Sequence, residues 1–289
     1  MSRLIFALMW LAHLLPLRAI AALGDAAGRL LFWLIPERRT VTRINLQKCF
    51  PQMPAAQRER LARAAFRAFC RAFVERAVLW WGSPERIQRM VRIEGIEHLE
   101  AAGPRVIIFA PHFAGLDAVG IRLSIEREMC TFYSHQKDPV LDRLLYDSRT
   151  RFRPDPKIAS RIRGLRPVVR WVREGIPLYF LPDMDVGARG AIFAPFFGVP
   201  AATVLGLPYI ARMARALVVP CVARMLPDGG YVGRFYPAWR DYPSGDDAAD
   251  VRRMNAFIEE RILEMPEQYH WLHKRFKTRP EGVPRPYDD

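Results

Sequence analysis

The sequence contains no pair of cysteines spaced like a metal-binding or redox motif. Its four cysteines lie far apart in a chain of 289 residues: Cys49, Cys70, Cys130 and Cys221. That spacing argues against a disulfide scaffold and a zinc ribbon, and it fits a reducing compartment. No internal repeat and no long linker interrupts the chain, so one domain of catalytic size is the simplest division.

Acidic residues are scarce relative to basic ones. The chain has 30 Asp and Glu against 44 Lys and Arg, a net charge of +14 and a pI of about 10.2. A basic protein of this size usually binds nucleic acid, a membrane surface or a phosphorylated substrate. Because the chain has neither zinc-finger spacing nor an aromatic-basic RNA-binding signature, we expect no nucleic-acid partner.

The amino-terminal apolar segment is shorter than the ~18–20 residues of a clean transmembrane span. Residues 4–17 lack Asp, Glu, Lys and Arg, and apolar residues return at 19–23 and 30–35, after interruptions that include Pro16 and Arg18. A tilted span, a re-entrant hairpin and an in-plane anchor all stay open. A cleaved signal peptide and a buried soluble helix are the rival interpretations.

Four basic residues follow this segment at once: Arg38, Arg39, Arg43 and Lys48. Positive charge beside an apolar segment is typical of the cytoplasmic headgroup region of a bilayer. We therefore expect residues 1–36 to form a membrane anchor or interfacial helices, and residues 37–289 to form the domain with the activity.

Residues 54–81 have the period of an amphipathic helix. At 100° per residue, four arginines fall within about 80° of one another and three phenylalanines cluster on the other side. They are Arg60, Arg63, Arg67 and Arg71, and Phe66, Phe69 and Phe73. Two interpretations stay open: the arginines lie on anionic lipid, or the helix packs in the core with a solvated basic face.

From about residue 104 onward, short apolar strands alternate with helices. The expected strands are 106–109, 177–181, 217–219 and 231–236, and the expected helices are 116–127, 139–152, 164–174, 203–215 and 249–264. Prolines end the first three strands. This alternation predicts an α/β fold with crossovers for the catalytic core, about 104–289.

The first candidate site follows the strand 106–109. On one continuous helix, His112 and Asp117 would lie about 140° apart, too far to touch. They can meet if His112 lies in the turn, where Pro111 and Gly115 favour a bend. Asp117 would then orient the ring, and the free ring nitrogen would take a proton from a hydroxyl. A surface histidine and a helix-capping aspartate are the alternative.

The second candidate site follows the strand 177–181. Asp183 and Asp185 suggest a cation site, but the remaining ligands of a calcium loop are absent. We favour a loop in which Asp183 holds the backbone or an arginine while Arg189 faces an anion. Structural loop acids are the alternative.

The third candidate is the carboxyl-terminal run 266–280. Five potential cations lie within residues 273–279: His273, Lys274, Arg275, Lys277 and Arg279. Flanked by aromatic residues, they would suit a phosphorylated amphiphile at a membrane edge. A solvated basic tail is the alternative.

Several blocks together resemble the bacterial lipid A late acyltransferases, the lauroyl and myristoyl transferases of lipopolysaccharide synthesis. The blocks are LMWLAHLLPL, NLQKCFP, PHFAGLD, PDMDVG with APFFGVPAAT, and PEQYHWLHKRFKTRP. The resemblance runs nearly end to end. The H-x-x-x-x-D element alone is shared with the wider glycerolipid acyltransferases.

The resemblance implies a single glycerolipid-acyltransferase-like domain with a mixed sheet flanked by helices, at a bacterial inner membrane. The family's catalytic histidine falls on His112, its acidic partner on Asp117, its essential arginine on Arg149 and its essential aspartate on Asp183. An acyl-carrier-protein thioester would be the donor and a phosphorylated glucosamine lipid the acceptor, with no cofactor or metal. Many family members have Glu at the position of Asp117, whereas glycerophosphate acyltransferases have Asp there, as this chain does.

In the expected mechanism, His112, oriented by Asp117, takes the acceptor's proton and the resulting alkoxide attacks the thioester, without an acyl-enzyme. Arg149, Arg189 and the tail cations are candidates for phosphate contacts. The rivals are the same chemistry on a lysophospholipid or amino-acid lipid, a non-catalytic basic binding protein, and a metal-dependent hydrolase using Asp183 and Asp185.

Overall fold

The structure, a computed structural model, describes residues 2–160 and 164–287. Its helices are α1 (Ser2–Ala12), α2 (Leu17–Leu34), α3 (Pro36–Cys49), α4 (Ala55–Trp81), α5 (Pro84–Met90), α6 (Ile96–Ala101), α7 (Leu116–Glu126), α8 (Pro139–Thr150), α9 (Arg166–Arg173), α10 (Gly206–Ala214) and α11 (Asp247–Glu264). Its strands are β1 (Val91–Glu94), β2 (Val106–Phe109), β3 (Cys130–Tyr133), β4 (Lys157–Ser160), β5 (Leu178–Phe180), β6 (Ala191–Phe196), β7 (Val199–Val204), β8 (Leu217–Met225) and β9 (Tyr231–Phe235). A short 3₁₀ helix, η2 (Pro266–Gln268), follows α11.

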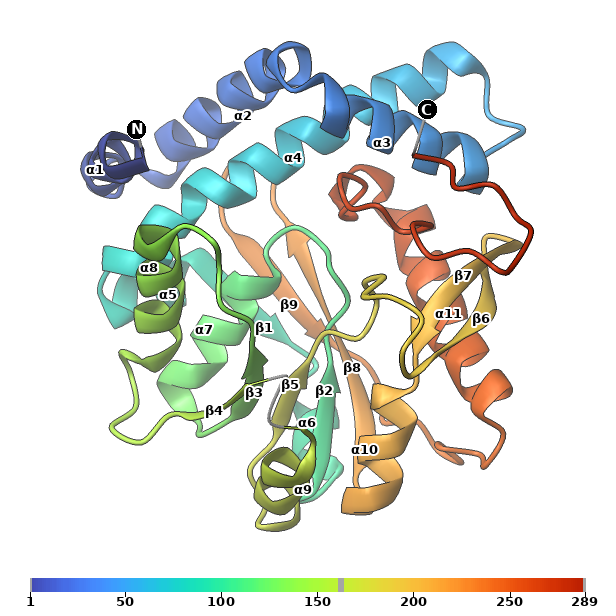
Figure 1. The fold of residues 1–289 in the computed structure, drawn as a ribbon. Helices are drawn as coiled ribbons and strands as arrows, with labels where there is room; N and C mark the ends of the chain where they lie inside the picture. Colours follow the sequence, from blue (N-terminus) through green and yellow to red (C-terminus); the bar gives the residue numbers. More distant parts are fainter. Residues whose placement is uncertain (1, 161–163, 288–289) are drawn as a thin grey trace.

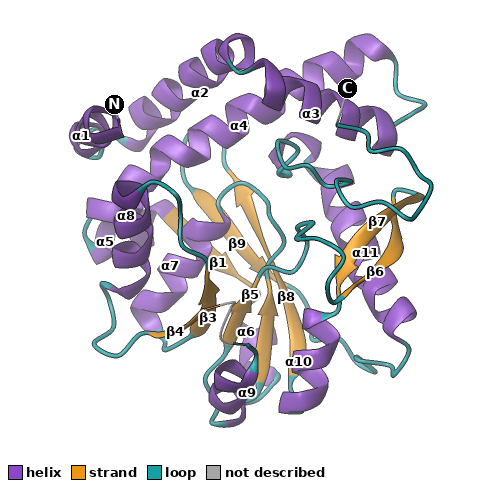
Figure 2. Ribbon diagram, viewed as in Figure 1, coloured by secondary structure: helices purple, strands orange, loops and turns teal. Residues whose placement is uncertain are grey.

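Within the described residues, seven strands form one sheet in the order β1-β9-β8-β2-β5-β3-β4 (Figure 1). Neighbouring strands run parallel except β8 and β9, which are antiparallel. β6 and β7 form a separate antiparallel hairpin. Helices flank the sheet (Figure 2), so the predicted mixed α/β fold is confirmed. Because parallel strands end at one edge, the loops after β2, β3 and β5 meet there.

The central strand β2 shows how the two faces of the sheet are covered. All four of its residues are buried. Ile107 and Phe109 belong to the apolar cluster that includes side chains of α9, α10 and α11. Val106 and Ile108 belong to the cluster that includes side chains of α5, α6 and α7. Successive side chains of a strand point to opposite faces, so a short all-apolar strand must be covered on both.

The strands predicted at 106–109, 177–181 and 231–236 are confirmed as β2, β5 and β9, and the helices predicted after residue 54 are confirmed as α4, α7, α8, α9, α10 and α11. The prediction that proline ends the strand 217–219 is wrong, because β8 continues to Met225. Pro220 pairs with the last residue of β2, and its carbonyl accepts the N–H of Tyr236 at 2.9 Å. A proline is tolerated where no donor is needed.

Five strands were not predicted from the sequence: β1, β3, β4, β6 and β7. The first three have only four residues each, and none is apolar throughout. β6 and β7 contain Pro195 and Pro200, which indicate breaks in a sequence but lie opposite each other in this hairpin.

Helix α2 packs directly on the arginine-bearing side of α4. A Cβ atom at Gly24 would lie 2.5 Å from the Cα of Arg71, and one at Gly28 would lie 2.5 Å from the Cα of Arg67. Arg71 is buried and donates to Glu75 at 2.9 Å, while Arg67 donates to Asp25 of α2 at 2.8 Å. The interpretation that the arginines of residues 54–81 lie on lipid is therefore wrong for Arg71, which α2 covers, whereas Arg60, Arg63 and Arg67 stay exposed.

The amino-terminal helices also share the core with the rest of the chain. Phe32 of α2 is buried in one apolar cluster with Phe66 of α4 and Trp271 of the carboxyl-terminal segment. The ring centroids of Phe32 and Phe66 are 5.2 Å apart.

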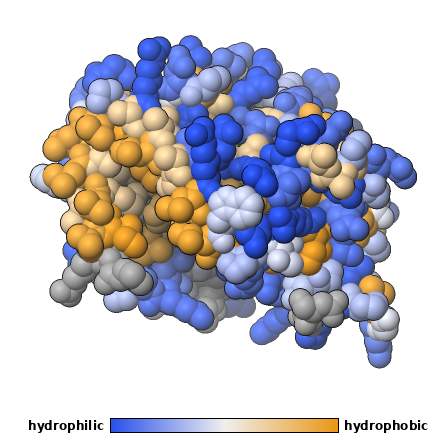
Figure 3. Space-filling model, turned by 90° about the horizontal axis from the view of Figure 1, so that it is seen from above, coloured by the Kyte–Doolittle hydropathy of each residue, from blue (hydrophilic) through white to orange (hydrophobic). Residues whose placement is uncertain are grey.

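Large apolar side chains remain exposed on α1, on α2 and in the turns beside them. They are Leu4, Ile5, Leu8, Trp10, Leu11, Leu14, Leu15, Leu23, Leu30, Trp33, Leu34 and Ile35. Seen from above, apolar side chains gather on one side of the molecule (Figure 3). Among the described helices, no single one is both long and apolar enough to cross a membrane. The pair α2 and α3, bent by 94°, meets that test only together.

Candidate active site

His112 lies in the loop between β2 and α7, at the carboxyl edge of the sheet. Asp183 follows β5, the parallel neighbour of β2, so the two loops meet. The Asp183 carboxylate accepts the backbone N–H of His112 at 2.9 Å and contacts the ring Nδ1 at 2.6 Å. With Nδ1 bound to a carboxylate, Nε2 is the ring nitrogen that can take a proton from a substrate.

The buried Asp183 carboxyl is held in its charged form. Burial by itself would raise its pKa, but the His112 charge, two hydrogen bonds from His112 and the Arg275 charge outweigh that effect and lower the pKa. An ionised, buried carboxylate on Nδ1 both orients the imidazole and stabilises the imidazolium that forms when Nε2 takes a proton.

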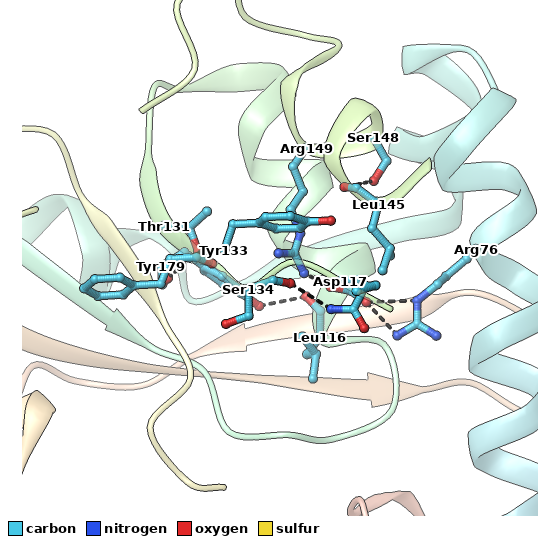
Figure 4. A network of polar contacts seen from close by, with 12 residues as sticks. Arg76, Leu116, Asp117, Thr131, Tyr133, Ser134, Leu145, Ser148, Arg149 and Tyr179 are labelled. Carbon is cyan, nitrogen blue, oxygen red and sulfur yellow. Dashed lines mark hydrogen bonds and ion pairs between the residues drawn. The ribbon is translucent and has the colours of Figure 1, made fainter. Parts of the chain in front are cut away.

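The prediction that Asp117 orients the His112 ring is wrong in this structure. Asp117 lies in the first turn of α7, where its Oδ2 accepts Nε and Nη2 of Arg76 at 2.9 and 2.6 Å (Figure 4). Its Oδ1 accepts Nη2 of Arg149 at 3.1 Å. Gly115, at φ +90°, turns the chain into α7, and Asp117 then contacts α4 and α8.

The two arginines dominate the electrostatics of Asp117. Burial would raise its pKa, but the charges and hydrogen bonds of Arg76 and Arg149 hold the pKa far below its usual range. Arg149 was predicted as a site residue. Arg76, which is 41 residues from Asp117 in sequence, was not. One signal in the sequence could have identified Arg76. It is an arginine between Glu75 and the apolar end of α4, and a charged residue in a helix that packs in the core usually has a partner.

A cavity of about 310 Å³ opens beside His112 and extends between α7 and the strands β3, β4 and β5. Its lining combines polar side chains, among them His112, Asp117 and Arg149, with apolar ones such as Ile121 and Ile158. A polar reaction centre beside an apolar pocket fits a substrate with one polar end and a hydrocarbon body.

The carboxyl-terminal segment is part of the site through its backbone. The N–H of His270 donates to the carbonyl of His112 at 3.0 Å, and the N–H of Ala114 donates to the carbonyl of Gln268 at 2.7 Å. Phe113 and Tyr269 form the β-bridge between these bonds. The PEQYHW block therefore holds the loop that presents His112.

The prediction that the tail cations bind a phosphate is wrong for Arg275. This side chain is 2% exposed, donates from Nη1 to the carbonyl of Ala202 at 2.9 Å, and lies 5.0 Å from the Phe196 ring centroid. It fixes the tail to β7.

The remaining predicted substrate cations also lie outside the lining of the cavity. Lys274 pairs with Glu37 at 3.3 Å and Arg279 donates to the carbonyl of Pro200 at 2.6 Å. Lys277 and Arg189 are exposed. The structure therefore brings Arg149 to the reaction centre and not these four cations.

Asp185 matches the interpretation of a structural loop acid. Its carboxylate accepts the N–H and the hydroxyl of Thr278 at 2.6 and 2.8 Å, and its own N–H donates to Nε2 of His273 at 3.1 Å. Within the part of the chain that the structure describes, no group of three or more His, Cys, Asp or Glu is placed to hold a metal ion. Asp185 therefore ties the loop after β5 to the carboxyl-terminal segment.

A row of rings packs beside the site. The His270 ring stacks on Phe69 at 5.1 Å and lies 6.4 Å from the His112 ring, between centroids. Burial, together with the nearby charges of His112 and His273, lowers the pKa of His270 to about 3. His270 is therefore neutral at physiological pH.

The fold and this site define an α/β enzyme with a histidine–carboxylate pair whose histidine lines a partly apolar cavity. A sequence profile of the bacterial lipid A biosynthesis acyltransferases matches residues 2–278, and the chain belongs to this family. The predicted resemblance is confirmed, and the protein is an acyltransferase.

The chain is similar to three Escherichia coli (strain K12) proteins. It is 32% identical to a lipid A biosynthesis lauroyltransferase over 96% of this chain and 92% of that protein. It is 31% identical to a lipid A biosynthesis palmitoleoyltransferase over 95% of this chain and 90% of that protein. It is 32% identical to a lipid A biosynthesis myristoyltransferase over 93% of this chain and 83% of that protein.

Proposed function

We propose that the protein transfers a fatty acyl chain from an acyl-carrier-protein thioester to a hydroxyl group of a phosphorylated lipid A precursor. The observation that carries this proposal is the contact of Asp183 with His112, which lines the cavity, 2.6 Å between Nδ1 and Oδ1. The pair supplies a base for a hydroxyl, and the cavity supplies an apolar site for the acyl chain.

In this mechanism Nε2 of His112 removes the proton from the acceptor hydroxyl. The hydroxyl oxygen attacks the thioester carbonyl carbon and forms a tetrahedral intermediate. The intermediate collapses, the C–S bond breaks, and the carrier thiolate takes the proton back from the imidazolium. Asp183 orients the ring throughout, in the role that the sequence analysis gave to Asp117.

No acyl-enzyme is needed, because the thioester is already activated. The cysteine that lines the cavity, Cys130, is a poor nucleophile, since burial raises its pKa to about 12.

Asp117 and its two arginines form the other half of the mechanism. Two guanidinium groups against one carboxylate leave the Asp117 cluster with net positive charge. Arg149 lines the cavity and is only partly exposed. We assign it to the negative charge that develops on the thioester oxygen, and Asp117 with Arg76 to holding it in place.

We also propose that the protein works at the cytoplasmic face of the bacterial inner membrane, with residues 1–36 as its anchor. The exposed apolar side chains of α1 and α2 support this contact. The net charge of +14 favours an anionic bilayer, an anionic acceptor and an acidic carrier protein.

The acceptor has one rival of the same chemistry. Many lipid A acyltransferases have Glu at the position of Asp117, whereas glycerophosphate acyltransferases have Asp there. Because this chain has Asp117, a lysophospholipid acceptor is the second candidate.

A transfer assay on membranes containing the protein separates these candidates. The acyl-carrier-protein donors are offered together with a lipid A precursor and a lysophospholipid, and products are weighed by mass spectrometry. We expect one new acyl chain on the glucosamine lipid, absent with His112→Ala. Transfer only to the lysophospholipid overturns the acceptor, and transfer to neither by folded protein overturns the activity.

A further inference from the structure

We infer that Tyr231 is a positioning residue for acyl transfer, because its ring fixes the turn at Gly115 in the loop that carries His112. The ring is itself held by the buried carboxyl group of Glu75. The inference rests on the proposed acyl transfer and adds two residues that the mechanism above does not use. They act on the rate through the backbone of the loop.

Gly115 makes the turn between the His112 loop and α7. Its φ is +90°, and its carbonyl accepts the N–H of Val119 at 3.1 Å where the helix begins. His112 lies three residues before this turn and Asp117 two residues after it. A rotation of the backbone at Gly115 therefore moves the base relative to Asp117. Because glycine adopts many backbone conformations with little strain, a contact from outside the loop must fix this one.

The ring of Tyr231 lies directly against this glycine. A Cβ atom at Gly115 would lie 2.1 Å from Cδ1 and 2.4 Å from Cε1 of Tyr231, so the ring packs on the backbone itself. Tyr231 is the first residue of β9 and is 1% exposed. β9 pairs with β1 on one side and with β8 on the other. The ring is therefore a fixed surface on which the turn packs.

The hydroxyl group of Tyr231 donates to Oε2 of Glu75 on α4. Glu75 is fully buried, and its Oε1 accepts Nε of Arg71 at 2.9 Å. Arg71 also donates to the carbonyl of Leu226 and, at 3.1 Å, to that of Pro227, so it ties the β8–β9 turn to α4 (Figure 1). Since both carboxyl oxygens are paired in a buried place, any shift of the ring would leave a polar group without its partner.

The same hairpin holds the loop at a second point. The side chain of Gln268 accepts the N–H of Met225 at 2.6 Å and donates to its carbonyl at 3.3 Å. The carbonyl of Gln268 accepts the N–H of Ala114 at 2.7 Å. Met225 is the partner of Tyr231 in the pairing of β8 with β9. One residue pair of the hairpin therefore controls two successive loop residues, Ala114 through Gln268 and Gly115 through packing.

A small cavity gives the loop room to move if the ring is lost. The cavity has a volume of about 110 Å³, and its lining includes His112, Gly115 and Tyr231. A smaller side chain at residue 231 would enlarge this space, and neighbouring groups relax partly into such a space. We therefore expect the loop to shift when the ring is removed.

Such a shift should affect the rate more than substrate binding. Tyr231 and Glu75 lie outside the lining of the 310 Å³ cavity beside His112. A misplacement of the base by about 1 Å can cost about 10²-fold in rate. A loss that appears equally in kcat and kcat/KM, with KM unchanged, identifies an interaction that acts in the transition state.

Three variants test this role in a transfer assay with an acyl-carrier-protein thioester and a lipid A precursor. Tyr231→Leu removes the ring and should lower kcat about 10²-fold, with each KM changed less than about threefold. Tyr231→Phe keeps the ring and loses one hydrogen bond, so kcat should fall less than about tenfold. Val251→Ala, in a buried cluster with Ala194 and Leu205, is the control for lost stability and should keep the wild-type kcat. Thermal unfolding checks that each variant is folded.

Two glycines separate contact with the ring from backbone strain. Gly115→Ala and Gly245→Ala both place alanine at a positive φ, +90° and +97°. The added Cβ meets the Tyr231 ring at the first position and nothing within 4 Å at the second. We expect kcat to fall about 10²-fold in Gly115→Ala and to keep its wild-type value in Gly245→Ala.

The double variant of Gly115→Ala with Tyr231→Leu tests whether the two residues act on one contact. The two losses should not multiply, because each substitution already breaks the packing of the ring on the turn. If Tyr231→Leu does not fold, the two glycine variants decide alone.

Wild-type kcat in folded Tyr231→Leu or folded Gly115→Ala would overturn the positioning role. Losses that multiply in the double variant, a loss confined to KM, or equal losses in Tyr231→Leu and Val251→Ala would overturn it too. An equal loss in Tyr231→Phe and Tyr231→Leu would overturn the assignment to the ring. A wild type that transfers no acyl chain would instead refute the proposed acyl transfer, so the two failures are distinguishable.

Discussion

The amino-terminal helices α1 and α2 expose many of their large apolar side chains, whereas the carboxyl-terminal segment, residues 266–280, buries its own. Leu8 and Leu11 are 57% and 55% exposed, while Trp271 and Phe276 are fully buried. The difference lies in the backbone: the carboxyl-terminal segment is hydrogen-bonded to the His112 loop. The carboxyl-terminal segment is thus held against the core, and its aromatic side chains are buried there.

This comparison separates two kinds of effect. Changes in the His112 loop or the carboxyl-terminal segment should affect catalysis and the free energy of unfolding. Changes on the exposed face of α1 should affect the contact with lipid and leave the fold intact.

The largest expected effect is at His112, the residue that the carboxyl-terminal backbone holds. His112→Ala removes the base and should lower the rate of acyl transfer by about 10³-fold. Asp183→Asn leaves the ring but removes the charged partner and should also cost about 10³-fold or more. Rates are measured by mass spectrometry, and His98→Ala on α6 serves as the control. Near wild-type transfer by folded His112→Ala would contradict the mechanism.

The next effect tests the burial of the tail. Arg275→Ala leaves the acceptors on β7 unpaired and opens a cavity, so it should lower the free energy of unfolding by about 3 kcal/mol. Lys277→Ala, two residues on and exposed, should change it by less than about 0.5 kcal/mol. Denaturant unfolding of both variants checks the contrast. Equal stabilities would show that the tail is not part of the core.

The next effect tests the exposed apolar face of α1 by its binding to lipid vesicles. Leu8→Glu combined with Leu11→Glu places two charges on the exposed face of α1, and should weaken binding to anionic phospholipid vesicles at least tenfold. Because both side chains are exposed, the free energy of unfolding should change by less than about 0.5 kcal/mol. Leu263→Glu on α11, at a position 65% exposed, is the control and should bind as the wild type does. Undiminished binding by the α1 variant would remove the anchor.

The smallest expected effect concerns pH. The pKa of His270 is lowered to about 3 in the folded protein, below the ordinary value of about 6.5. The unfolded chain therefore binds the proton first, and this residue lowers stability as pH falls from about 6.5 toward 3. His270→Phe should remove about 0.7 kcal/mol of the stability loss between pH 7 and about pH 6. Superimposable stability curves for the variant and wild type over that range would show that His270 is not buried neutral.

The extent of prediction differs between the fold and the site. Short apolar runs such as 106–109 predict β2 because all four residues are apolar and a proline follows soon after. β3 and β4 were missed because their side chains are only partly buried, which erases the pattern that marks a strand. In the site, His112 and Asp183 were both recognised, but their contact was not.

That contact could not be predicted because it depends on strand order. Asp183 is 71 residues from His112, and only the pairing of β2 with β5 brings their loops together. Arg76 was missed for the same reason, since α4 reaches Asp117 only by packing across α7.

The sequence by itself determined the α/β class, the strand–turn–helix position of His112, the family and the apolar character of the amino-terminal segment. These features depend on local patterns and on short blocks of residues. Only the tertiary structure decided which carboxylate meets His112, that Arg275 lies in the core, and which side chains line the cavity beside His112. Each of these depends on distances between segments far apart in the chain, and such distances are set by how the strands pair and the helices pack.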